Sequence, residues 1–75
     1  MSVYDQEYRH PTQASTVVLS LFDEGPARYL VTESRSGPQT VVATLGVFDR
    51  RDDAMARLAH RGQELARQRY ELVAS

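Results

Sequence analysis

A chain of 75 residues has room for one small domain, because a separate hydrophobic core needs on the order of 50 residues or more. It contains no cysteine and only two histidines, which excludes a disulfide framework and argues against a structural zinc site. Its nine basic residues nearly balance ten acidic ones, so the composition lacks the strong positive charge typical of nucleic-acid-binding proteins.

All nine basic residues are arginine, and the chain contains no lysine, asparagine or isoleucine. The codons of these three residues are rich in A and T, so we expect a GC-rich bacterial genome as the source. No apolar run approaches the roughly 20 residues of a membrane span, and the N-terminal segment lacks the basic-then-apolar pattern of a signal peptide. These features predict a cytoplasmic protein without a membrane partner.

Residues 1–13 are polar and acidic and are interrupted by His10-Pro11, a pattern typical of an arm outside the core. Tyr4 and Tyr8 are the exceptions, because a tyrosine ring gains stability when it packs against a domain. The arm is therefore expected either to dock through these rings or to remain disordered. Residues 14–75 are predicted to form the single domain.

Three segments after the arm are rich in β-branched and aromatic residues, which favour strands. They run from Thr16 to Phe22, from Arg28 to Glu33 and from Thr40 to Phe48. Clusters of glycine, proline and polar residues at 23–26 and 34–38 mark short connections between them. The three segments therefore predict a three-stranded antiparallel meander.

Asp49 is placed to cap a helix, with Asp52 three positions later as its partner in the first turn. Beyond it, small and apolar residues fall on one side of a helix and charged residues on the other, which predicts an amphipathic helix. Gly62 lies on the apolar side and indicates close approach of the helix backbone to the sheet. Arg69 interrupts that side, so the helix either continues past it or ends before it and leaves a short fourth strand near 70–73.

The predicted fold class is α+β, with a β-β-β-α order in which the meander packs on one C-terminal helix. Alternation directs one set of side chains toward the helix. That set consists of Val17, Leu19 and Leu21 from the first strand and Val41, Ala43, Leu45 and Val47 from the third.

The opposite face of the predicted sheet is also apolar, although one helix covers only one face. It carries Val18, Phe22 and Val42, with either Leu30 or the pair Tyr29 and Val31 from the second strand. Soluble proteins seldom leave a large contiguous apolar patch bare. There are three candidates to cover this face: the arm, a second copy of the chain, or a different protein. A homodimer would also stabilise a domain this small.

Catalytic residues are not indicated by any motif. His10 and His60 are the residues that titrate near neutral pH, and His60 has Glu64 four positions later, the spacing of an ordinary contact on a helix surface. The sequence contains no phosphate-binding glycine loop, nucleophile elbow or pair of metal ligands. We therefore predict a protein that is not an enzyme and holds neither cofactor nor metal.

Surface arginines are the remaining polar feature. Arginine makes bidentate contacts with phosphate, and the candidates for nucleic-acid contacts are Arg28, Arg35, Arg50, Arg57 and Arg61. Acidic residues at helical spacing, such as Asp53 before Arg57, neutralise part of this charge.

The residues from Thr44 to Asp49, followed by Arg50-Arg51-Asp52-Asp53-Ala54, resemble the strand-to-helix junction of AP2-type domains and of the related arm-binding domains of tyrosine integrases. The resemblance covers about residues 44–59. It implies a three-stranded sheet packed on one C-terminal helix, with the sheet lying in the major groove of DNA. That mode needs basic and aromatic side chains on the exposed sheet face, where this sequence offers Arg28, with Arg35 as a second candidate.

Together these patterns predict a small non-catalytic interaction module that self-associates or binds a partner protein through its exposed sheet face. Its predicted contact residues are Val18, Phe22, Arg28, Leu30 and Val42. The alternative is a small nucleic-acid-binding accessory protein of the AP2 or integrase-arm type that uses the surface arginines.

Overall fold

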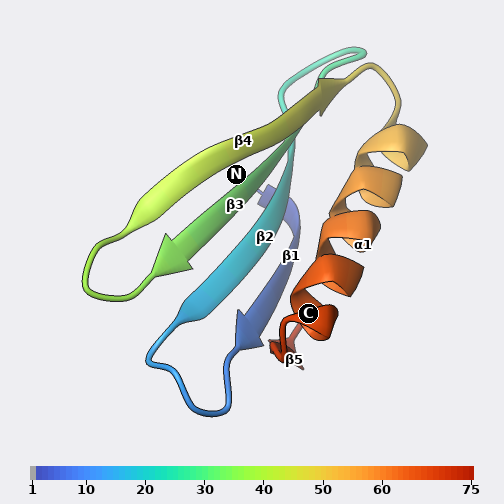
Figure 1. Cartoon of the computed structure of the whole chain (residues 1–75). Coiled ribbons are helices and arrows are strands. Elements are labelled where there is room, and N and C mark those ends of the chain that lie inside the picture. Colours follow the sequence, from blue (N-terminus) through green and yellow to red (C-terminus); the bar gives the residue numbers. More distant parts are fainter. Residues whose placement is uncertain (1) are drawn as a thin grey trace.

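The computed structural model describes residues 2–75, which form a five-stranded antiparallel sheet with one helix on one face (Figure 1). The strands are β1 (Ser2–Arg9), β2 (Thr16–Asp23), β3 (Tyr29–Ser36), β4 (Val41–Phe48) and β5 (Glu71–Ala74), and the helix is α1 (Arg51–Arg67). Their order across the sheet is β4-β3-β2-β1-β5, so α1 carries the chain from one edge back to the other. The α+β class and the meander followed by a helix are confirmed, with β1 and β5 as two further strands.

The segment predicted as an arm is strand β1, which lies inside the sheet between β2 and β5. Tyr4, Gln6 and Tyr8 face α1 across from the buried side chains of β2. The Tyr8 hydroxyl donates a hydrogen bond to Gln6 Oε1 (2.8 Å), and Gln6 Nε2 donates one to the Tyr4 hydroxyl (2.8 Å). The segment predicted as an arm is therefore an inner strand. Its helix-facing and outward-facing residues alternate with a period of two, and the average polarity of the segment does not reveal this alternation.

The core lies between the inner strands and α1. Val17, Leu19 and Leu21 of β2 are fully buried there, as predicted. Val31 of β3 and the helix residues Ala54, Leu58 and Leu65 complete the centre of this cluster. The helix therefore covers β1, β2 and the neighbouring part of β3.

A β-bulge in β4 reverses the faces predicted for the end of that strand. The pairing with β3 shifts by one residue at Leu45, which has no partner of its own. One inserted residue turns every later side chain to the other face. Phe48 therefore packs against the core, whereas Val47, predicted to face the helix, lies across from Leu30 on the opposite face.

The start of α1 differs from the predicted cap. Asp49 precedes the N-cap residue, which is Arg50 in an extended conformation without a side-chain hydrogen bond. Asp52 and Asp53 lie in the first turn, where a negative charge stabilises the positive end of the helix dipole. The acidic residues thus act here through charge and not through a capping bond.

The end of α1 is a Schellman motif with Arg69 in the left-handed position, at a φ of 72°. The Tyr70 N–H donates to the Leu65 carbonyl (3.0 Å), and the Arg69 N–H donates to the Ala66 carbonyl (3.1 Å). This reversal places Tyr70 in the core and lets β5 pair with β1. The short strand near 70–73 is therefore confirmed as β5, and continuation of the helix past Arg69 was the wrong alternative.

Gly62 lies where α1 passes closest to β1. A Cβ at this position would collide with the Tyr8 hydroxyl. The predicted close approach of the helix backbone to the sheet is confirmed, and its partner is a tyrosine of the segment that the sequence placed outside the core.

Candidate functional site

The face of the sheet opposite α1 has no other described part of the chain packed against it (Figure 1). We call it the open face. Its apolar side chains are Val18 and Phe22 from β2, Leu30 from β3, and Val42 and Val47 from β4. Four of the five predicted contact residues therefore share one surface. Since β1 is a strand, the N-terminal segment is no longer a candidate cover for this face.

The strand register arranges the open face in rows. Phe22 pairs with Leu30, which pairs with Val47, so the three form one apolar row across β2, β3 and β4. A second row places Val18 and Val42 on either side of Ser34, and hydroxyl side chains of Ser20, Thr32 and Thr44 form the row between them. No charged side chain lies within these three rows over the three strands.

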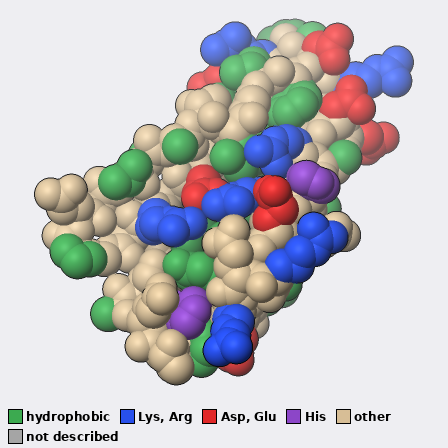
Figure 2. Space-filling model, in the orientation of Figure 1, with side chains coloured by type: hydrophobic (Ala, Val, Ile, Leu, Met, Phe, Trp, Pro, Cys, Tyr) green, Lys and Arg blue, Asp and Glu red, His purple; other side chains and the backbone are tan. Residues whose placement is uncertain are grey.

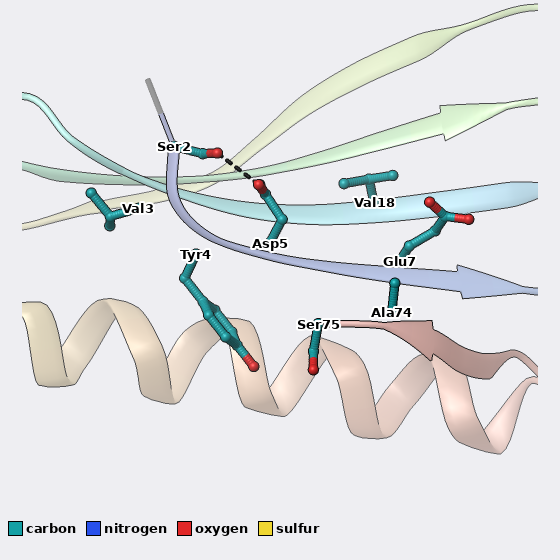
Figure 3. A pocket seen from close by; sticks show the side chains of 8 residues that line it. All are labelled: Ser2, Val3, Tyr4, Asp5, Glu7, Val18, Ala74 and Ser75. Atoms are coloured by element: carbon teal, nitrogen blue, oxygen red, sulfur yellow. Dashed lines mark hydrogen bonds between the residues drawn. The ribbon is translucent and has the colours of Figure 1, made fainter.

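The charged side chains of the open face lie on β1 and on β5, where Glu71 pairs with Arg9. Asp5 pairs with Ser20, and Glu7 pairs with Val18, so acidic side chains border the apolar rows on the side away from β4. They line a solvent-open hollow of about 730 Å³ beside the end of β5, in which Figure 3 shows Asp5 and Glu7 on the side away from the helix and Tyr4 directed toward it. Asp5 accepts a hydrogen bond from the Ser2 hydroxyl (2.7 Å). The apolar surface is therefore bordered on one side by the acidic side chains of β1 and on the other side by strand β4.

The β4 border is an unpaired strand edge, because within residues 2–75 β3 is the only neighbour of β4 in the sheet. Val41 is 57% exposed and Val42 is 66% exposed, although they point to opposite faces. Val41 and Ala43 were predicted to contact the helix, and this is corrected: they lie on the helix side but are exposed, since the β3–β4 hairpin extends beyond the helix (Figure 1). The first half of β4 is therefore apolar on both faces and unpaired along its edge.

The five arginines predicted as nucleic-acid contacts do not share a surface. Arg28 lies in the β2–β3 turn and pairs with Glu24 (3.0 Å), and Arg50 is exposed at the start of α1. Arg35, Arg57 and Arg61 lie on the helix side of the sheet, in the seam between α1 and β3. Arg28 directly precedes β3 and lies two residues before Leu30 in the chain, with its guanidinium paired to Glu24, so its role at the rim of the protein contact stays a prediction.

The seam is held by an ion-pair network. Figure 2 shows basic and acidic side chains gathered near the middle of the face that it draws. Arg61 donates two hydrogen bonds to Glu33, the longer at 3.2 Å from Nη2 to Oε2, and its Nη1 lies 3.5 Å from Glu64 Oε1. Burial alone would raise the pKa of Glu33, but the hydrogen bond and charge of Arg61, with a smaller contribution from Arg35, hold that pKa below its ordinary value. Arg35 also lies over the Tyr70 ring, 5.8 Å from its centroid.

The histidines lie apart and carry structural contacts. His10 Nδ1 accepts hydrogen bonds from the backbone N–H groups of Thr12 and Gln13 (3.2 Å each), and its ring packs edge-on against Tyr70. His60 is exposed beside Glu64. Within residues 2–75 no group of three or more acidic or histidine side chains is placed to hold a metal ion. The same residues include no helix that is long and apolar enough to cross a membrane.

Sequence reasoning missed Val47 as a member of the open face. A bulge is signalled only by Gly46, and a glycine in a strand fits several local structures. The predicted meander already placed the strand at 40–48 at one edge of the sheet, whereas the other edge is β5, which lies beyond a strand, β1, that the sequence placed outside the sheet. Comparison of the chain with protein-family models, with curated proteins and with solved structures found no match.

Proposed function

We propose that this protein is a non-catalytic interaction module that self-associates through the open face of its sheet. The observation that carries the proposal is the uncovered apolar surface formed by Phe22, Leu30 and Val47 with Val18 and Val42. A contiguous apolar patch of this kind is typical of a protein interface. A second copy is the occupant that the charges favour: the rows are uncharged, so two copies meet without repulsion, and the acidic side chains lie at one border.

Two open faces would pack as the two sheets of a β-sandwich do, about 10 Å apart and with interdigitating inner side chains. Phe22 lies in the row that spans three strands, so it is the expected anchor of the contact. The helices would then lie on the two outer surfaces. This arrangement buries apolar surface that a domain of 75 residues cannot bury alone.

Nucleic-acid binding by the sheet, the alternative from the sequence, has less support. The open face carries acidic Asp5 and Glu7 with Arg9, and Arg9 is paired with Glu7 (3.1 Å). A sheet that enters the major groove needs basic side chains on that face, because phosphate contacts dominate the affinity for DNA. The acidic side chains on this face would repel the phosphates of DNA.

The test replaces Phe22 with aspartate and measures the mass in solution by light scattering after a sizing column. The wild type is expected at a multiple of the 8.5 kDa chain, and Phe22→Asp is expected to lower that multiple, because a buried unpaired carboxylate is costly. Leu72→Asp is the matched control, since Leu72 is half exposed but lies on the helix side of β5. A Phe22→Asp protein with the wild-type mass would contradict the proposal.

A further inference from the structure

We propose that the outer edge of β4 is a second self-association surface, on which β4 of another copy pairs in antiparallel orientation. An unpaired strand edge presents a row of backbone N–H and C=O groups that can bind another strand. Natural edge strands are protected by charge, by proline, by short length or by a bulge. β4 has eight residues without charge or proline, and its one bulge, at Leu45, leaves the half from Val41 to Thr44 regular and unprotected.

The other edge of the sheet differs from β4 in length and in charge. β5 has four residues, begins with Glu71, and pairs only with the segment Glu7–Arg9 of β1. A contact of β4 with β5 of the next copy would match a long edge to a short one and would propagate as an open filament. Pairing of β4 with itself is isologous and closes, so a second copy of β4 is the partner that fits.

Side-chain chemistry agrees with this partner. An axis beside Ala43 would place Ala43 next to its own copy and Val42 next to Thr44, without bringing like charges together. The charges of the open face lie on β1 and β5, at least three strands away from the new contact. Val42 belongs to both surfaces, so edge pairing would join the apolar rows of two copies into one continuous face.

The two surfaces together define an assembly. The axis of antiparallel edge pairing stands perpendicular to the sheet and the axis of face packing lies parallel to it, so the two interfaces close at four copies when these axes intersect. The expected mass is about 34 kDa, four times the 8.5 kDa chain. The mass of four copies rests on the proposed association through the open face. The edge contact is independent of that association, because Val41 and Ala43 point to the helix side.

The experiment measures the masses of four proteins by light scattering after a sizing column. Wild type is expected at about 34 kDa, Phe22→Asp and Ala43→Lys each at about 17 kDa, and the double variant at 8.5 kDa. Ala43→Lys acts because lysines placed side by side repel and protect an edge. Ala56→Lys makes the same change on an exposed part of α1 and is expected to keep the wild-type mass.

Failure of each proposal has its own signature. A wild type of about 17 kDa that Phe22→Asp converts to monomer would overturn the edge proposal and keep the open face. If the wild type has this same mass and only Ala43→Lys converts it to a monomer, the proposed contact through the open face is overturned and the edge contact is kept. A monomeric wild type would overturn both.

A second measurement does not depend on the folding of a variant. Amide hydrogen exchange of the wild type should show protection along the whole stretch Val41–Thr44 at high protein concentration, including amides that point away from β3. Dilution should release those outward amides while the amides of β2 stay protected. Exchange of the β4 amides that is independent of concentration would overturn the edge contact.

Discussion

Arg61 on α1 and Glu33 on β3 form a two-bond ion pair across the seam between the helix and the sheet, 28 residues apart in the chain. The Glu33 residue is only 9% exposed, and its carboxylate accepts two hydrogen bonds from Arg61 and a longer one, at 3.5 Å, from Arg35. Breaking such a pair costs more than forming it gains, because the remaining charge stays buried without a partner. The pair therefore fixes the lateral position of α1 over β3.

Removal of Arg61 should make stability less dependent on pH. The pKa of Glu33 is held below its ordinary value of 4.5, so its contribution to folding is complete above that value and is lost as the pH falls through the lower, folded pKa. Arg61→Met should lower the free energy of unfolding at neutral pH by about 1.5–3 kcal/mol. The deficit should shrink as the pH falls below 4.5 and Glu33 of the wild type becomes protonated.

Thermal unfolding at matched protein concentration measures this effect, since association makes Tm depend on concentration. At neutral pH a loss on the order of 10 °C is expected. Arg67→Met is the control, because Arg67 is an exposed helix residue and should change Tm little at any pH. A deficit of Arg61→Met that stays constant from neutral to acidic pH would show that the Glu33 carboxylate does not carry the stability.

Gly62→Ala should destabilise the protein, although alanine is the better helix former by about 1 kcal/mol. The added Cβ would collide with the Tyr8 hydroxyl, which is itself held by its hydrogen bond to Gln6. Overpacking of this kind costs about 1–3 kcal/mol. In a Tyr8→Phe background the collision is removed, so the same substitution should be neutral or stabilising there.

A double-mutant cycle by urea unfolding separates these two effects. Ala59→Gly, on an exposed position of the same helix, measures propensity alone. An equal effect of Gly62→Ala with and without the Tyr8 hydroxyl would contradict the close contact.

The helix and the meander were predictable from the sequence because their signals are local. Val17, Leu19 and Leu21 alternate, and the apolar side of α1 recurs with helical spacing. Four residues of the open face followed from the same alternation. Local patterns therefore identified both the fold class and most of the candidate surface.

The remaining features depend on interactions between distant segments. β1 can have polar residues on its helix-facing side because the side chains of Tyr4, Gln6 and Tyr8 form hydrogen bonds with one another under α1. Val47 changed face because of one inserted residue, Leu45. The position of β5 at the opposite edge of the sheet is a property of the strand order, which neither periodicity nor composition reports.

Arg69→Gly should stabilise the protein, because Arg69 holds the left-handed position that ends α1. A side chain with a Cβ is strained at a φ of 72°, whereas glycine adopts this conformation freely. Greater freedom of glycine in the unfolded chain offsets part of the gain, so the expected increase is up to about 1 kcal/mol. The hydrogen bonds from Tyr70 and residue 69 to the helix end involve the backbone and should persist.

Gln68→Gly is the matched control, since Gln68 is the neighbouring residue and has a φ of −89°, where glycine brings only its entropic cost. It should lower Tm, while Arg69→Gly raises it by several degrees in a chain of this size. Circular dichroism melts of the two variants at one protein concentration provide the comparison. If both glycines lower Tm alike, the left-handed strain at Arg69 does not limit the stability of the helix end.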